Sequence, residues 1–233
     1  MSDERDAYGD AEHTPLPRPR DVLAALGTLT VLPLPRPSPG SEDFGRAALF
    51  FPLVGLMIGA LLVGMHRVTI HLPAWWAAMV VVGVWEALTG AGLLRARAPG
   101  GAGELVVIGA IVAAKAVCTA AAAARPAALL FAPLLARWAL VVLATGVRDA
   151  AAPGRKFNPA ITFREFALAS VFSFAAVFAV AEAFGILIVV AVAALTLGVR
   201  LLVHRWAGGV SWRFLLACVE GIEVFVLLLC ALL

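Results

Sequence analysis

The segment Gly208-Gly209-Val210-Ser211-Trp212-Arg213, followed by the apolar stretch Phe214–Leu233, decides how this chain folds. The apolar stretch is long enough to cross a membrane as a helix, yet it contains two carboxylates, Glu220 and Glu223. A spacing of three residues places both carboxylates on one face of that helix. An ionisable group at bilayer depth is costly, so by default it marks a functional site with partners elsewhere in the chain. The remaining sequence should therefore supply a membrane scaffold and cationic partners.

The composition indicates an integral membrane protein. Of the 233 residues, 62% are hydrophobic and 14% are charged, and the mean hydropathy is +0.97. Soluble domains are about 45–50% apolar and about 25% charged, and a soluble chain of this size could not hide so much apolar surface from water. The net charge of +3 comes from basic residues scattered across loops, which excludes a nucleic-acid partner. The three cysteines lie apart in apolar segments and indicate neither a disulfide framework nor a metal site.

The N-terminal 45 residues differ from the rest of the chain. Residues 1–20 are polar and rich in Asp, Glu, Arg and Pro, which predicts a disordered tail. Residues 21–32 predict a short interfacial or re-entrant helix, because this apolar run cannot span a bilayer. Residues 33–45 form a Pro-rich connector. A transmembrane helical domain over residues 46–233 completes the predicted organisation.

Six apolar blocks make up the predicted transmembrane domain. Five of these blocks have lengths close to the ~20 residues that a helix needs to cross a bilayer. The block Phe166–Val203 is almost twice as long as one span requires and is interrupted at Gly185. We divide this block into two helices, which gives an all-α, polytopic bundle of about seven transmembrane helices. The expected helices are Ala47–Met65, Pro73–Leu94, Leu105–Ala124, Ala127–Gly146, 164–181, 184–204 and Phe214–Leu233.

The loop charges support seven spans and set the orientation. Fourteen of the 18 Lys and Arg residues fall on the N-terminal side of the membrane, and only Arg67 and Arg125 fall on the other side. The positive-inside rule then places the N-terminus in the cytoplasm and the chain in the cytoplasmic (inner) membrane. Treating Phe166–Val203 as one span would move three arginines between residues 200 and 213 to the wrong side. Within the first span, Gly55 and Gly59 form a GxxxG pattern, which predicts close helix packing.

Charged residues inside the spans form the candidate site. Lys115 and Arg137 lie near the middle of their helices, and Glu86, Glu220 and Glu223 lie in two others. These side chains cannot all face lipid. One interpretation is that they form interhelical salt bridges that fix the bundle. The other is a polar cavity open to one side, in which the two cations hold phosphate and the three glutamates hold Mg²⁺.

Two apolar segments also carry a resemblance to a known family. Leu26–Pro35 (LGTLTVLPLP) and Phe50–Gly59 (FFPLVGLMIG) resemble the N-terminal part of cobalamin synthase, the adenosylcobinamide-GDP ribazoletransferase family. Shorter matches are Thr89-Gly90, Lys115, Arg137-Trp138-Ala139 and residues 208–224. The family consists of polytopic membrane enzymes that join adenosylcobinamide-GDP to α-ribazole and release GMP. The resemblance therefore implies corrinoid and nucleotide substrates and Mg²⁺ as cofactor, with Lys115, Arg137, Glu220 and Glu223 as catalytic residues.

Two motifs depart from the family pattern. After the Thr-Gly pair the family carries an Asp-rich segment, DGLADTADGL, whereas here Gly90 leads without any aspartate to Arg95. Near the C-terminus the family reads GGxTGDxxGAxNE, and here Ser211 and Arg213 stand for the Thr and the Asp. Aspartates at helix ends are the natural Mg²⁺ ligands for phosphoryl transfer, and an arginine holds phosphate but not metal. We therefore expect Ser211 and Arg213 to contact substrate, and the sequence favours an inactive relative over an active transferase.

Three functions remain open. The chain is a cobalamin-synthase relative (an active enzyme, or a non-catalytic protein that binds a corrinoid or nucleotide), a small transporter, or a structural membrane subunit. No internal repeat is visible, which weighs against an inverted-repeat transporter. A cavity beside the buried charges, closed on the far side, would favour the first, and direct pairing without a cavity would favour the last. The lipid bilayer is an expected partner in each case, and homo-oligomerisation is left open.

Overall fold

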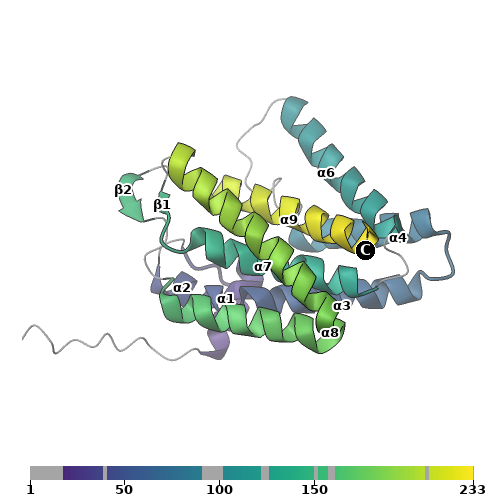
Figure 1. Cartoon of the computed structure of the whole chain (residues 1–233), viewed down its shortest axis with the longest axis horizontal. Coiled ribbons are helices and arrows are strands. Elements are labelled where there is room, and N and C mark those ends of the chain that lie inside the picture. The colour runs from purple at the N-terminus through teal and green to yellow at the C-terminus, as the bar shows by residue number, and fades with distance from the viewer. Residues whose placement is uncertain are drawn as a thin grey trace, which may run out of the picture.

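The computed structural model describes residues 18–38, 41–90, 102–121, 126–149, 152–156, 161–207 and 210–232, and these are almost entirely helical (Figure 1). The elements are α1 (Pro19–Leu29), α2 (Glu42–Ala48), α3 (Phe51–Val68), α4 (Ala74–Thr89), α6 (Ala102–Ala121), α7 (Pro126–Ala144), β1 (Arg148–Asp149), β2 (Ala152–Lys156), α8 (Phe163–Leu202), the π-helical turn η2 (Val203–Ala207) and α9 (Trp212–Leu232). The prediction of an all-α, polytopic membrane fold is confirmed. The antiparallel hairpin β1–β2 is a small addition between α7 and α8.

The N-terminal region contains more helix than the sequence predicts. Residues 1–17 of the predicted tail lie outside the described part of the chain, and residues 19 and 20 already belong to α1. The connector predicted over residues 33–45 ends in α2, which begins after Ser41. The Ser41 hydroxyl accepts a hydrogen bond from the Phe44 backbone N–H, a typical helix N-cap.

Seven apolar helices make up the described membrane domain. Five are long and apolar enough to cross a membrane: Phe51–Val68, Pro126–Ala144, Phe163–Ala181, Phe184–Arg205 and Trp212–Leu232. Ala74–Thr89 and Val106–Ala121 are shorter apolar helices. Helix α4 ends before the predicted Leu94 because Gly90 adopts a left-handed conformation (φ 68°) at its C-cap, which glycine tolerates best.

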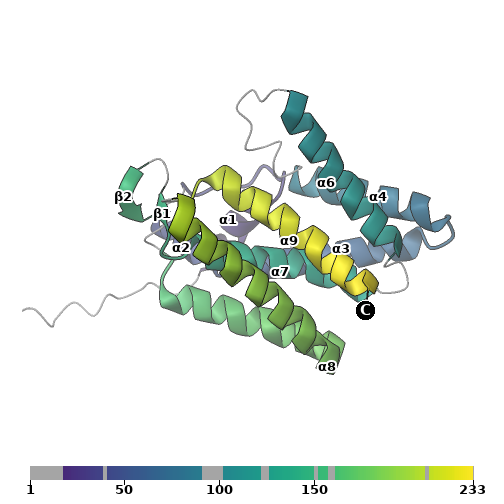
Figure 2. The ribbon, with the colours of Figure 1, turned by 45° about the horizontal axis from the view of Figure 1, so that its top comes forward.

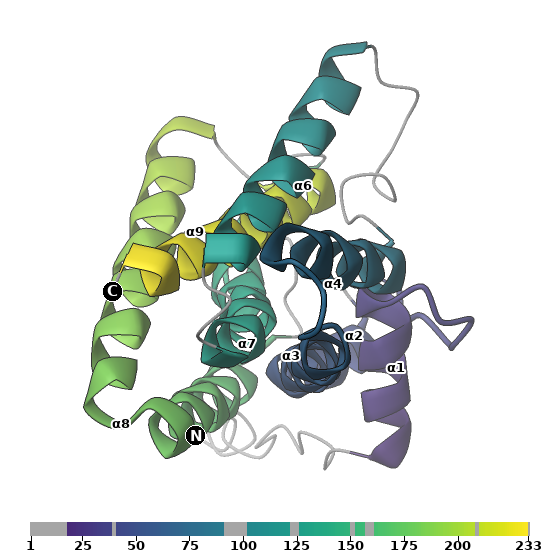
Figure 3. The same ribbon diagram turned by 90° about the vertical axis from the view of Figure 1, so that its right-hand side faces the viewer.

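Helix α8 folds back on itself, as Figures 1 and 3 show. A Cβ atom placed on Gly185 would lie 3.0 Å from Cγ1 of Val177. In a straight helix two positions eight residues apart are about 12 Å apart along the axis, so the chain must reverse between them. The two arms, Phe163–Ala181 and Phe184–Arg205, are each long enough to span the membrane. The predicted division of this block is therefore confirmed.

Helix α7 lies at the centre of the bundle, with α3, α8 and α9 packed around it (Figures 2 and 3). Almost all of its side chains are buried. Polar contacts tie it to both arms of α8: the Trp138 indole N–H donates to the Ser170 hydroxyl (2.9 Å), and the Arg200 guanidinium donates to the Val142 carbonyl. Residues carried by α7 are consequently held in a fixed position relative to the other helices.

The GxxxG face of α3 packs directly on the backbone of α7. A Cβ atom on Gly55 would lie 2.9 Å from Cα of Leu134, and one on Gly59 would lie 2.8 Å from Cα of Leu130. No L-residue side chain fits these gaps without moving one helix away from the other. The predicted close packing is confirmed, and its partner is α7.

Replacing Gly55 or Gly59 by Ala is expected to lower the free energy of unfolding by about 1–3 kcal/mol, because the added methyl group must push two backbones apart. Gly64 lies in the same helix with nothing within 4 Å of its Cβ position, so Gly64→Ala is a matched control. This control should keep or raise stability, since Ala favours helix over Gly. Thermal unfolding of the purified variants in detergent measures the difference, and equal melting temperatures for all three would contradict the packing described here.

Candidate functional site

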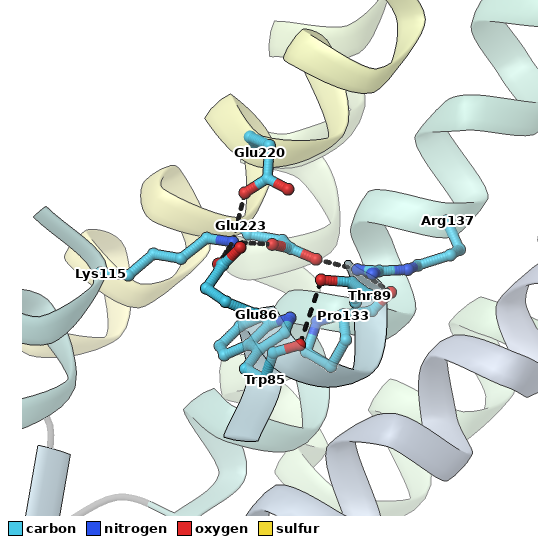
Figure 4. A network of polar contacts seen from close by, with 8 residues as sticks. All are labelled: Trp85, Glu86, Thr89, Lys115, Pro133, Arg137, Glu220 and Glu223. Carbon is cyan, nitrogen blue, oxygen red and sulfur yellow. Dashed lines mark hydrogen bonds and ion pairs between the residues drawn. The ribbon is translucent and has the colours of Figure 1, made fainter. Parts of the chain in front are cut away.

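Five charged side chains from four helices meet inside the bundle (Figure 4). They are Glu86 on α4, Lys115 on α6, Arg137 on α7, and Glu220 and Glu223 on α9, and we call them the charge cluster. Lys115 and Glu223 are fully buried, and Arg137 and Glu220 are almost so. The structure therefore brings together all of the intramembrane charges that the sequence analysis selected.

Lys115 occupies the centre of the three carboxylates. Its ammonium group donates hydrogen bonds to Glu86 Oε1 (2.7 Å) and to Glu220 Oε2. The same nitrogen lies 2.5 Å from Glu223 Oε2, an ion pair that lacks hydrogen-bond geometry. The ring of Trp85 lies 4.8 Å from the nitrogen and adds a cation–π contact. One ammonium thus links α4, α6 and α9.

Arg137 completes the charge cluster on the side of Glu223 that faces away from Lys115. Its guanidinium donates to Glu223 Oε1 and makes a long contact of 3.5 Å to the carbonyl oxygen of Pro133. Its Nε atom is buried and has no hydrogen-bond acceptor among the described residues. Three carboxylates and two cations leave the charge cluster with one net negative charge when all five groups are ionised.

A small pocket of about 50 Å³ adjoins the charge cluster. Its polar lining comes from four helices: Thr28 on α1, Thr89 on α4, Arg137 on α7 and Glu220 on α9, with Trp212 beside them. The two threonine hydroxyls donate to carbonyls of their own helices, at 2.7 Å and 3.1 Å, and their oxygens retain acceptor capacity. The volume exceeds the ~10–15 Å³ that one water requires, so the pocket has room for several waters or one small polar group.

The short helix α1 contributes Thr28 and Leu29 to the lining of this pocket. Two residues beyond the end of α1, the Val31 N–H donates to the Leu88 carbonyl (2.8 Å) in the last turn of α4. The Arg36 side chain donates back to the Gly27 carbonyl (2.8 Å) and holds the following segment over α1. The sequence analysis quoted this stretch for its resemblance but missed Thr28 as a pocket residue. The signal available was a pair of hydroxyls, Thr28 and Thr30, in an otherwise apolar run.

Ser211 and Arg213 do not join the charge cluster. The Ser211 hydroxyl accepts a hydrogen bond from the Phe214 N–H (3.3 Å) at the start of α9, and both residues are exposed. Arg213 precedes Glu220 by about 10 Å of helix. Gly208 and Gly209 lie outside the described residues. A role for Ser211 and Arg213 in binding substrate stays a prediction.

The predicted Mg²⁺ ligands converge, but on a different cation. The carboxylates of Glu86, Glu220 and Glu223 all point at the Lys115 ammonium, which occupies the place where a shared metal ion would have to sit. Within the described ranges no group of three His, Cys, Asp or Glu residues is arranged to hold a metal. In this arrangement the three glutamates do not fit Mg²⁺.

Arg137→Met is expected to lower the free energy of unfolding by about 3–5 kcal/mol, because Glu223 Oε1 then loses its partner in a buried position. The double variant Arg137→Met/Glu223→Gln should recover much of this loss, since the uncompensated carboxylate is gone. Arg20→Met provides a control at an exposed ion pair, where the cost should stay below about 1 kcal/mol. Unfolding in detergent measures all three, and a double variant as unstable as the single one would refute the pairing as the source of stability.

Comparison with known proteins identifies related sequences. The chain matches the family described as cobalamin-5-phosphate synthase over residues 21–94 and 98–231. Proteins named adenosylcobinamide-GDP ribazoletransferase are 45% identical over 67 residues in Acinetobacter baumannii, 42% over 69 residues in Deinococcus radiodurans and 41% over 73 residues in Pseudomonas paraeruginosa. These alignments span 28–31% of this chain and only 25–30% of the relatives' length. No solved structure matches the chain.

Proposed function

The chain belongs to the cobalamin-5-phosphate synthase family, and we propose that it is a non-catalytic member that binds a phosphate-bearing corrinoid or nucleotide. The observation that carries this proposal is the pocket beside Arg137, where a buried guanidinium with an unpartnered Nε meets two threonine hydroxyls and a carboxylate. The relatives' printed name states that they act on adenosylcobinamide-GDP and transfer a ribazole group. Both substrates of such a transfer carry the chemical groups that this pocket suits.

The pocket combines one donor group with several acceptors in a way that suits a sugar phosphate. The Arg137 guanidinium hydrogen-bonds phosphate oxygens with directional strength. The oxygens of Thr28 and Thr89, whose protons are donated within their own helices, can accept from sugar hydroxyls. Glu220 supplies an acceptor for a ribose hydroxyl on the same ligand. At about 50 Å³ the pocket takes only such a polar end, so the rest of the ligand would lie outside it.

The transfer reaction itself needs more than this pocket offers. Phosphoryl transfer depends on positioning and on neutralising charge that develops on phosphate oxygens, commonly by metal ions. The Asp-rich segment of the family is missing after Thr89-Gly90, and Arg213 stands where the family has an aspartate. The remaining carboxylates are bound to Lys115 and Arg137. These facts favour binding without transfer.

The test uses the purified chain in lipid nanodiscs with adenosylcobinamide-GDP, α-ribazole 5′-phosphate and Mg²⁺. We expect at least one ligand to raise the melting temperature, and no metal-dependent release of GMP. Thr28→Val should weaken that binding about 5-fold, the effect of losing one hydrogen bond of about 1 kcal/mol. Thr196→Val removes a buried hydroxyl with the same type of helix contact on α8, away from the pocket, and should leave binding unchanged.

Two results would overturn this proposal in different ways. Failure of both ligands to bind would remove the pocket from consideration. Metal-dependent GMP release that is lost in Glu220→Gln would establish an active transferase, the activity for which the relatives are named. A matched active relative assayed alongside provides the positive control for both measurements.

We further propose that the chain lies in the cytoplasmic (inner) membrane with its N-terminus in the cytoplasm, supported by the loop charges. Both Arg67, in the last turn of α3, and Arg205, at the end of the second arm of α8, are exposed. In a chain with its three cysteines replaced, Arg67→Cys should react with an impermeant maleimide in intact cells, and Arg205→Cys only after permeabilisation. The reverse labelling would invert the topology.

A further inference from the structure

We propose that the turn between α3 and α4 binds the headgroup level of the bilayer through Trp75 and Trp76, and that this anchor holds the charge cluster at the bilayer midplane. We call residues 66–76 the interface turn, because they include the last residues of α3 and the first of α4. It lies at the end of the molecule opposite the hairpin β1–β2 (Figures 1 and 2). The inference concerns membrane depth, and it holds whether or not the pocket binds the ligand proposed above.

The apolar residues of the interface turn suit a lipid surface. Val68, Ile70 and Leu72 are exposed, and so are Trp75 and Trp76. A group of large exposed apolar side chains marks an interaction surface. Tryptophan favours the level of the lipid headgroups, because its ring is apolar and its N–H is polar.

The charges of the interface turn complement phospholipid headgroups. Residues 66–76 contain one arginine and two histidines but no Asp or Glu. Arg67 and His71 are exposed, so their side chains can reach headgroup phosphates while the apolar side chains enter the acyl region. Apolar and cationic residues without carboxylates are the combination that an anionic lipid surface attracts.

Hydrogen bonds hold the interface turn in a fixed shape. The Leu72 N–H donates to the Thr69 carbonyl (2.9 Å), and the Thr69 hydroxyl donates to the Met65 carbonyl (3.0 Å). Trp75 and Trp76 follow in the first turn of α4. The level at which the two indole rings lie therefore fixes the depth of the whole helix.

Helix α4 translates the level of the tryptophans into a depth for the charge cluster. Glu86 follows Trp76 by ten residues, which is about 15 Å of helix. The hydrocarbon core of a bilayer is about 30 Å thick. With Trp76 at its edge, Glu86 lies at its centre, and so does the Lys115 ammonium that Glu86 contacts. At this depth an ionised group is farthest from water and most dependent on its partners.

The same depth makes the end of α1 re-entrant. Leu88, whose carbonyl accepts the Val31 N–H, lies about 18 Å of helix beyond Trp76. Val31 therefore lies about 12 Å inside the opposite edge of the hydrocarbon core. Val31 and Leu32 are exposed apolar residues, as contact with lipid at that depth requires. Of the two placements that the sequence leaves open for this segment, interfacial or re-entrant, the second follows.

Spin-label depth measurements on the full chain in proteoliposomes test this arrangement. In a chain with its three cysteines replaced, a nitroxide is attached at Trp76→Cys, Gly83→Cys or Ala87→Cys, three exposed positions of α4. Relaxation of the label by oxygen and by a water-soluble nickel chelate gives its depth below the nearer membrane surface. We expect position 76 at the surface, position 83 about 10 Å deeper and position 87 about 16 Å deeper than position 76.

Two further labels sit on exposed residues outside α4. Ile70→Cys should read the same surface level as Trp76→Cys, and because it keeps both tryptophans it reports the level of the interface turn even if Trp76→Cys alters it. Val31→Cys keeps the backbone N–H that donates to Leu88, and its label should lie about 12 Å below the opposite surface.

Three results would overturn the proposal. Equal depths at positions 76 and 87 would mean that α4 is centred in the bilayer. Full exposure to the nickel chelate at position 70 would place the interface turn in water, and the same result at position 31 would place the end of α1 there. These depths are independent of ligand binding and of GMP release, so the proposed function can fail without changing them.

Discussion

The structure depends on neutralising one ammonium group inside the membrane. Lys115 is fully buried in α6, a helix that packs mainly against α4 and α9, and its three carboxylate partners come from these two helices. An unpaired charge in hydrocarbon is so costly that helices which fail to meet here would not form a stable bundle. The position of α6 is therefore set by a polar contact, because little apolar packing holds it to the rest of the molecule.

The opposite half of the bundle is organised by close backbone contact. Gly55 and Gly59 let α3 lie against α7, and α7 carries Arg137 to Glu223. In lipid, where apolar association gains little, small residues and internal polar pairs are the available means of holding helices together. Glu223 joins the two halves, since one of its oxygens contacts Lys115 and the other contacts Arg137. Scaffold and candidate site are thus the same set of interactions.

The sequence predicted the members of the charge cluster correctly but not their pairing. Intramembrane charge identifies Glu86, Lys115 and Arg137 without any structure, because such groups must face the bundle interior. Which carboxylate faces which cation depends on the depth and tilt of each helix, and spacing along the chain does not encode these. The division of α8 could be predicted from the length of the apolar block and the loop charges, whereas the early end of α4 depends on the backbone conformation of Gly90. A polar cavity beside the charges was expected, and Arg137 and Glu220 do line the pocket. Thr28 was missed because its segment is joined to α4 by the backbone hydrogen bond from Val31 to Leu88, which carries no side-chain signal.

The family matches and departures occupy different places in the structure. Lys115, Arg137 and Glu220, which match the family pattern, belong to the buried charge cluster that holds the helices together. One departure follows Gly90, the C-cap of α4, and the other is Arg213, an exposed residue in the first turn of α9. A carboxylate at a helix end contributes little to the stability of a bundle, so losing it does not unfold the protein. Losing one partner of a buried ion pair is strongly destabilising. Under the function proposed above, this chain keeps the buried charges and the helix arrangement of its family without the metal-dependent reaction for which its relatives are named.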